Sequence, residues 1–166
     1  LTERGIEFEE EMERLGMIID VAHLNDAGIR DVLKYTKKPF VASHSNARAV
    51  CSSLRNLSDD RIRKLAERGG CMGLNYYDKF LVDGGSEDTE VLWEALIQQA
   101  RHITNVGGIE VLGLGSDFDG IPINPAVPGA EAMPVLWERL KTAGFTESQL
   151  DGMFWKNVMR VYRETL

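Results

Sequence analysis

The sequence predicts an α/β fold in which four short strands form a parallel sheet and helices connect them. The predicted strands are short apolar runs, at residues 17–22, 39–43, 71–77 and 109–116. Segments with the apolar spacing of helices lie between them, and such alternation is typical of parallel strand–helix units. Three runs end near His23, His44 and Asp117. Because the carboxyl ends of parallel strands share one edge, which carries the chemistry in such folds, a site is expected there.

The first half of the chain has clear helix boundaries. Thr2 is a suitable N-cap for a helix over 2–15, and Gly16 is a suitable end. A second helix is expected to begin at Asn25 or Asp26 and to run to about Tyr35, before Pro39 opens the second strand. The run 17–22 is expected to be buried on both faces, as strands of parallel sheets usually are.

A long polar segment, residues 45–56, follows the second strand and is expected to be a binding loop. Ser58 caps the next expected helix, which runs over about 59–68 and ends at Gly69. The predicted strand 71–77 then ends in polar and aromatic residues, which are expected at the same carboxyl-terminal edge of the sheet.

A long helix over about 89–106 precedes the last strand. Its inward side is predicted to hold Val91, Leu92, Leu96, Ile97 and Ile103. Residues 120–129 carry three of the five prolines and are expected to form a loop. Helices over about 131–143 and 146–164 close the chain, the second with the capping-box pattern of Thr146 and Gln149.

Composition narrows the functional classes. The 166 residues are 43% hydrophobic, which suits one globular domain spanning residues 1–166. A net charge of −7 argues against binding of nucleic acid. No apolar run approaches the roughly 18 residues of a membrane helix. Cys51 and Cys71 are too few for a disulfide framework, so we expect two buried or half-buried thiols and a cytoplasmic location.

His23 and His44 are the strongest candidates for metal ligands. Neighbouring strands lie about 4.8 Å apart, so imidazoles at two strand ends can meet on one zinc ion, which binds nitrogen at about 2.0–2.1 Å. Asp20, three residues before His23, either bonds within the core or orients a ligand, and the supporting role is favoured. His102 lies in the middle of a helix and is expected to be a surface or helix-packing residue.

Two other residue types complete the candidate site. Asp117 and Asp119 would lie on one face if the last strand extended that far, and an acid beside a metal can move protons. The alternative is a turn in which both aspartates cap the following loop. Arg55, in the polar loop, could clamp a substrate carboxylate through two hydrogen bonds or could be an ordinary surface arginine. Arg48 is a weaker candidate.

Four strands are few for a closed barrel, which needs eight. The chain is therefore expected to form either a small open sheet or half of a larger structure. Because it starts at Leu1 within what reads as a helix lead-in, it is expected to be a fragment or a processed product.

The motifs 16–23, 43–45, 50–56 and 115–120 together strongly resemble the membrane (renal) dipeptidase family of zinc peptidases. The resemblance covers nearly the whole chain in order and spacing. It implies the C-terminal half, the last four strand–helix units, of a (β/α)8 barrel of the amidohydrolase type. It also implies hydrolysis of dipeptides at a site that holds two zinc ions in the complete enzyme.

The resemblance assigns roles to four residues. His23 and His44 would bind one of the two zinc ions, Arg55 would bind the dipeptide's C-terminal carboxylate, and Asp117 would bind substrate and act on the water and the leaving amine. The family's early His-x-Asp pair, its bridging glutamate and a further substrate-binding histidine have no counterpart in this chain. The chain alone is therefore expected to be inactive and to hold at most one zinc ion, weakly.

Two alternatives remain open from the sequence. One is a metal hydrolase of the amidohydrolase type that acts on a non-peptide substrate, against which the Arg55 clamp argues. The other is an inactive barrel fragment that serves as a binding module. In either case the expected partner is a second copy of the chain or the missing N-terminal half.

Overall fold

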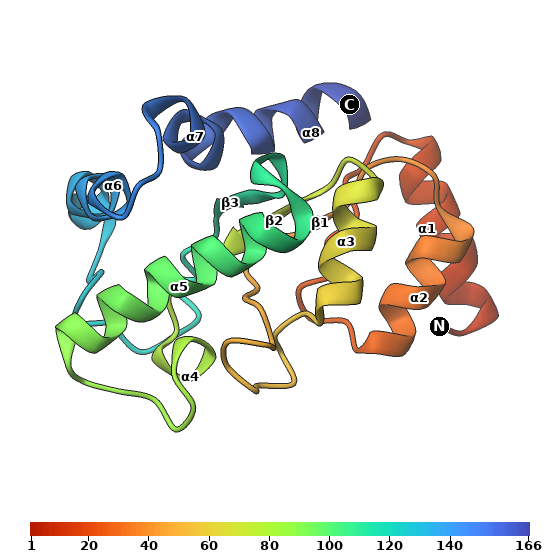
Figure 1. Cartoon of the computed structure of the whole chain (residues 1–166). Helices are drawn as coiled ribbons and strands as arrows, with labels where there is room; N and C mark the ends of the chain where they lie inside the picture. The colour runs from red at the N-terminus through yellow and green to blue at the C-terminus, as the bar shows by residue number, and fades with distance from the viewer.

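The computed structural model describes all residues 1–166, which form an α/β fold around a three-stranded parallel sheet (Figure 1). The helices and strands in chain order are α1 (Glu3–Arg14), α2 (Asp26–Tyr35), β1 (Val41–Ala42), α3 (Asp59–Glu67), β2 (Cys71–Leu74), α4 (Asp78–Leu81), α5 (Thr89–Gly107), β3 (Leu112–Leu114), α6 (Met133–Thr142), α7 (Glu147–Asp151) and α8 (Asn157–Thr165). The alternation of strands and helices confirms the predicted class.

The sheet has the order β1-β2-β3, with Val41 opposite Cys71 and Met72 opposite Leu112. The predicted first strand, residues 17–22, is extended beside β1 but pairs with it only through a bridge between Asp20 and Val41. Two backbone hydrogen bonds hold this bridge, from Val21 to the Val41 carbonyl at 2.8 Å and from Val41 to the Ile19 carbonyl at 2.9 Å. All four predicted strands therefore lie side by side, but each is shorter than expected.

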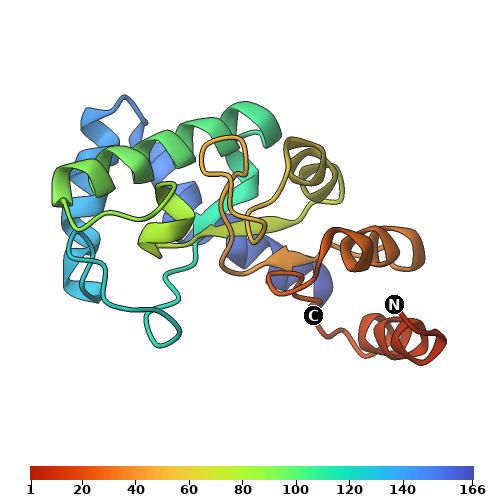
Figure 2. The same cartoon turned by 90° about the horizontal axis from the view of Figure 1, so that it is seen from below.

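The two faces of the sheet differ in how they are covered. Helices α3 and α5 pack on one face, which carries the buried side chains Ala42, Met72 and Leu112. Figure 2, a view from below, shows α5 running along this side. The opposite face lines a hollow of about 510 Å³ beneath α8.

This hollow corrects the prediction that residues 17–22 are buried on both faces. Ile19 and Val21 point into the core, whereas Asp20 is exposed and Met17 is 52% exposed. The alternation follows from the extended backbone, which points successive side chains to opposite faces. The apolar character of Met17 and Ile18 is thus not explained by burial within this chain.

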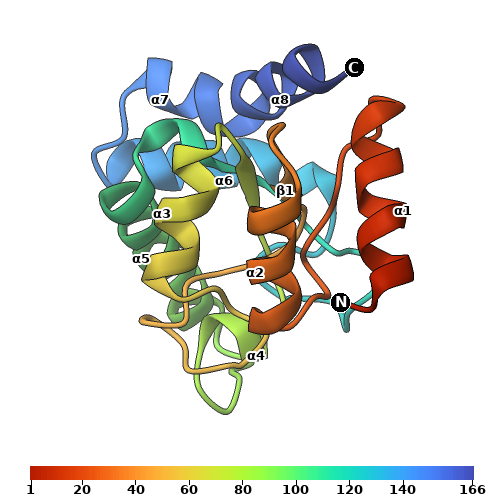
Figure 3. The same cartoon turned by 90° about the vertical axis from the view of Figure 1, so that its right-hand side faces the viewer.

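The predicted helix caps at Thr2 and Thr146 are confirmed, whereas Ser58 lies at the N-cap position of α3 without making a side-chain capping bond. The Thr2 hydroxyl accepts the Gly5 amide at 3.1 Å, and Gly16, two residues after the end of α1, adopts a φ of +75°. Thr146 and Gln149 form a complete capping box, with bonds of 3.3 Å and 2.8 Å. In Figure 3, α1 and α2 stand side by side at the amino-terminal end of the chain.

Four local features differ from the expectations. The short helix α4 was not predicted, and Ile109–Val111 form a 3-10 turn before β3. Val91 is 44% exposed because it lies on the outer side of α5. The last predicted helix contains a wide π turn, Gly152–Lys156, between α7 and α8. The Asn157 amide, which follows this turn, donates to the carbonyls of Ile109 at 2.8 Å and Leu112 at 2.7 Å.

Helix α8 crosses the amino-terminal ends of the strands, away from the histidines. Arg160 of this helix donates to the carbonyl of Gly69, just before β2, and to that of Glu110, just before β3, the latter at 3.2 Å. The carboxyl ends of the strands are therefore left clear of the C-terminal helices. None of the helices has the length and apolar character needed to cross a membrane.

Candidate functional site

His23 and His44 meet at the carboxyl ends of two neighbouring extended segments. His23 follows the bridge at Asp20 and Val41, and His44 follows β1. Their Nε2 atoms lie 2.9 Å apart, with ring centroids 4.9 Å apart and planes tilted by 59°. The parallel pairing of the two segments explains why side chains 21 residues apart in sequence converge.

Asp20 and Ser43 lie directly behind these histidines. One oxygen of Asp20, Oδ1, accepts the backbone amides of Ala22 at 3.0 Å and Ser43 at 2.9 Å. The other, Oδ2, accepts the Ser43 hydroxyl, whose oxygen lies 2.7 Å from Nδ1 of His44. This position suits the supporting role predicted for Asp20. Ser43 was not predicted as a site residue from the sequence, although it directly precedes His44 in the chain.

Arg55 lies on the same edge, close to His23. Its guanidinium donates to the carbonyl of Ala22 and lies 5.7 Å from the ring centroid of Phe80. The loop 45–56 folds back over the strand ends, and this fold-back brings Arg55 beside a residue 33 positions earlier. Arg55 is half-buried.

Arg48 anchors this loop from within the protein. It donates to both carboxylate oxygens of Asp26 at 3.1 Å and 3.2 Å, and to the carbonyl of Asn56 at 2.9 Å. The hydrogen bond from Arg48 holds the pKa of the Asp26 carboxyl below its usual value. With its donors occupied in this way, Arg48 is a structural residue.

A second anchor of the loop is the carbonyl of Phe80, which accepts three buried side-chain amides. They come from Asn46 at 3.1 Å, Asn56 at 3.0 Å and Gln99 at 3.4 Å. Buried amides require partners, so these bonds tie the loop to α4 and α5. The sequence analysis did not identify this cluster, because its shared acceptor is a backbone atom that no residue type reveals.

Asp117 lies in a turn beyond β3. Its φ is +62°, and its carbonyl accepts the Gly120 amide at 2.9 Å. The carboxylate accepts the side-chain amide of buried Asn75 at 3.1 Å, and no hydrogen bond joins it to either histidine. Because β3 ends at Leu114, the strand does not extend to Asp117 and Asp119, and Asp119 is exposed on the turn.

The donor set fits part of a zinc site. Two imidazole nitrogens converge, which suits a metal that commonly takes histidine ligands. No group of three or more His, Cys, Asp or Glu side chains lies close enough together to hold a metal ion. Two imidazoles are fewer than the three protein ligands that a catalytic zinc site needs.

His102 and the two cysteines lie outside the site. His102 contacts Asp59 at 2.8 Å and joins α5 to α3, which confirms helix packing. Cys51 and Cys71 are both free and buried, as expected. Burial raises the pKa of the Cys71 thiol to about 12 and that of Cys51 above its usual value. Both shifts lower the fraction of the reactive thiolate form at neutral pH.

Two glycines, Gly73 and Gly115, lie against the backbone carbonyl of Ser43. A Cβ atom placed on Gly73 would lie 2.1 Å from the Ser43 carbonyl oxygen, and one on Gly115 would lie 2.0 Å from the same atom. Both distances are far below a van der Waals contact, so no side chain fits at either position. β2 and the segment after β3 therefore approach β1 more closely than side chains would allow.

Comparison with known proteins identifies the family. The profile described as "Membrane dipeptidase (Peptidase family M19)" matches residues 1–166. A Klebsiella pneumoniae protein from the pqqA 5′ region is 33% identical over 163 residues, which are 98% of this chain and 60% of that protein. An uncharacterized dipeptidase of Schizosaccharomyces pombe is 35% identical over 167 residues, 99% of this chain and 40% of that protein.

Solved structures agree with these relatives. A metallopeptidase from Rhodobacter sphaeroides, liganded with a phosphinate mimic of the dipeptide L-Ala-D-Ala, superposes with a TM-score of 0.95 at 33% identity. The match covers 100% of this chain and 47% of that one, so the chain spans about half the length of such structures. A probable dipeptidase from Pseudomonas aeruginosa, 19% identical with a TM-score of 0.91, shares the fold. The chain belongs to the membrane dipeptidase family, peptidase family M19.

Proposed function

We propose that this chain supplies half of the active site of a zinc-dependent dipeptidase that hydrolyses the peptide bond of dipeptides. The observation that carries the proposal is the convergence of His23 and His44, whose Nε2 atoms lie 2.9 Å apart at one end of parallel segments. Membership of the dipeptidase family and the phosphinate dipeptide mimic bound to the Rhodobacter sphaeroides relative support a dipeptide as substrate.

In this proposal His23 and His44 hold one zinc ion, and ligands from outside this chain complete a site for two. A bound zinc ion supplies a Lewis acid that activates water and polarises the scissile carbonyl. The residues of this chain then bind, orient and transfer protons around that water. Because the chain offers two ligands, zinc binding by the chain alone is weak.

Arg55 binds the substrate's carboxylate, and Asp117 transfers a proton at the scissile bond. The Arg55 guanidinium, beside His23, pairs with the C-terminal carboxylate of the dipeptide through two hydrogen bonds. The Asp117 carboxylate, held by Asn75, takes a proton from the attacking water and gives it to the leaving amine as the C–N bond breaks.

The fold that suits this proposal is the C-terminal half of a (β/α)8 barrel. Four extended segments lie side by side, α3 and α5 pack on one face of the sheet, and the opposite face lines an open hollow beneath α8. In a closed barrel that face would be the interior, and active-site residues would lie at the carboxyl ends of the strands. His23, His44 and Arg55 lie at that end.

The test is dipeptide hydrolysis by the complete protein in which this chain forms one half. His23→Ala and His44→Ala should each lower kcat by at least about a hundredfold and should each reduce the bound zinc, because a direct ligand is lost. The matched control is His102→Ala, which removes a histidine that bonds only to Asp59. Full activity and full zinc content in either ligand variant would contradict the proposal.

A further inference from the structure

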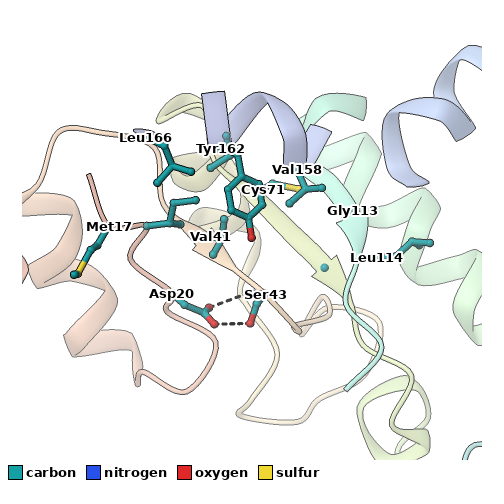
Figure 4. A pocket seen from close by; sticks show the side chains of 13 residues that line it. Met17, Asp20, Val41, Ser43, Cys71, Gly113, Leu114, Val158, Tyr162 and Leu166 are labelled. Atoms are coloured by element: carbon teal, nitrogen blue, oxygen red, sulfur yellow. Dashed lines mark hydrogen bonds between the residues drawn. The ribbon is translucent and has the colours of Figure 1, made fainter. Parts of the chain in front are cut away.

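A chain of hydrogen bonds runs from Asp20 through Ser43 to His44. The Ser43 hydroxyl oxygen contacts Oδ2 of Asp20 and lies 2.7 Å from Nδ1 of His44. Oδ1 of Asp20 is held separately by the backbone amides of Ala22 and Ser43. Figure 4 shows Asp20 and Ser43 facing each other at one side of the hollow beneath α8. The carboxylate is therefore fixed at both oxygens.

The donor and the acceptor of each hydrogen bond follow from which atoms carry hydrogen. An ionised carboxylate has no hydrogen, so the Ser43 hydroxyl donates its single hydrogen to Asp20. The hydroxyl oxygen then presents only lone pairs to His44, and Nδ1 of His44 must carry a proton and donate it. Because a neutral imidazole holds one proton, Nε2 of His44 keeps a free lone pair.

His23 carries its proton on the other ring nitrogen, Nε2. Its Nε2 lies 2.9 Å from Nε2 of His44, and no hydrogen bond reaches its Nδ1. Two lone pairs cannot form a hydrogen bond, so Nε2–H of His23 donates to Nε2 of His44. In the metal-free chain the two imidazoles thus hold different tautomers.

We infer that Asp20 and Ser43 are positioning residues that fix His44 as the Nδ1–H tautomer, with Nε2 ready to bind metal. His23 has no such support and must move its proton from Nε2 before that atom can bind. The inference about metal binding rests on the proposed function, whereas the assignment of tautomers does not. Partners behind a ligand histidine typically change metal affinity by about 10- to 100-fold.

The tautomers can be measured directly in the metal-free, 15N-labelled complete protein, with the His23 and His44 signals assigned from their alanine variants. Long-range 1H–15N correlation spectra at about pH 8.5, where ordinary imidazoles are neutral, distinguish protonated from unprotonated ring nitrogens. The expected result is a protonated Nδ1 for His44 and a protonated Nε2 for His23. A protonated Nε2 on His44 would overturn the inference.

Asp20→Asn is the sharpest variant because it preserves the shape of the side chain. Its amide oxygen can keep the two backbone hydrogen bonds, and its NH2 group then donates to the Ser43 oxygen. The hydroxyl hydrogen is then free to turn toward Nδ1 of His44, so the His44 tautomer should shift toward Nε2–H. Ser43→Ala removes the acceptor, and His44 should show a mixture of tautomers. An unchanged His44 tautomer in both variants would show that the hydrogen-bond chain does not set it.

Two control variants match these changes away from the site. Asp59→Asn alters the carboxylate beside His102, and Ser58→Ala removes a hydroxyl that makes no capping bond to α3. Both should leave the His44 spectrum unchanged. A similar change of the His44 spectrum in the control variants would show that the effect comes from a general loss of stability, and it would overturn the inference.

Zinc titration of the same samples separates this inference from the proposed function. Zinc should perturb His23 and His44 in the unaltered complete protein, and Asp20→Asn should weaken binding by about 10- to 100-fold. If zinc leaves both histidines unchanged, the proposed metal site is wrong, and the metal part of the inference is wrong with it. If zinc binds but the measured tautomers differ from those above, the positioning role alone is wrong.

Discussion

Arg55 shows how a loop residue can become part of a site through one backbone contact. Its guanidinium donates to the carbonyl of Ala22, which fixes the charge next to His23. We predict that Arg55→Lys in the complete enzyme lowers kcat/KM for dipeptides with a free carboxylate by about 10- to 100-fold, because lysine lacks the planar fork. Dipeptide C-terminal amides, assayed side by side, should lose much less. Equal losses on both substrates would argue against a carboxylate clamp.

Asp117 combines a candidate chemical role with an unusual backbone conformation. Its φ of +62° is tolerated by asparagine and aspartate better than by most residues. We therefore expect Asp117→Asn to keep the turn and the melting temperature, while kcat in the complete enzyme falls by about 10²- to 10⁴-fold through loss of proton transfer. Thermal unfolding and steady-state kinetics test the two parts. A variant with normal kcat would exclude Asp117 from the proton transfer.

The junction between α7 and α8 is the element that joins the end of the chain to the sheet. Asn157 donates to two backbone carbonyls, those of Ile109 and Leu112, immediately after the wide turn. We predict that Asn157→Ala lowers the free energy of unfolding by about 2 kcal/mol, since two acceptors lose their partner. Urea unfolding of the complete protein, followed by circular dichroism, measures this change. Met159→Ala, on an exposed part of α8, is the control and should change stability by less than about 0.5 kcal/mol.

The sequence predicted helices better than strands, for a physical reason. Helix ends depend on local residues, such as Thr2 and the Thr146–Gln149 capping box, which can be read directly. The extent of a strand depends on its neighbours, and residues 17–22 have a neighbour on only one side in this chain. The wide turn at Gly152–Lys156 also has no local signature, because it accompanies the distant contacts of Asn157.

The candidate site shows the same division. His23 and His44 were predictable as neighbours because parallel strands place their carboxyl ends together. Ser43 was not singled out, since its position between Asp20 and His44 emerges only when the two segments pair. The roles assigned to Arg55 and Asp117 came from resemblance to the family, and the experiments above test them.

At the scale of the whole molecule, one face of the sheet remains largely open. The hollow beneath α8 is lined mainly by apolar side chains, and Met17, Tyr162 and Leu166 around it are 52%, 45% and 81% exposed. The segment 17–22 and β3 lie at the two edges of the sheet, where each pairs with a strand on one side only. Such edges and apolar faces favour association with another chain.

We therefore predict that the 166-residue chain on its own does not remain a well-folded monomer. It should pair with a second copy, or with the N-terminal half of the barrel when the two are mixed. Size-exclusion chromatography with light scattering at micromolar concentration measures the state directly. A monomer that melts cooperatively would show that the open face is stable in water, and the half-barrel proposal would then be wrong.

The two glycines that crowd the Ser43 carbonyl limit how this architecture can diversify. Since neither position 73 nor position 115 can carry a side chain, no new chemical group can reach the site from these two positions. Within this chain, a change in substrate preference would have to arise elsewhere, for example in the loop 45–56 that brings Arg55 beside His23. Variation in such a loop would leave the strands that position the two histidines unchanged.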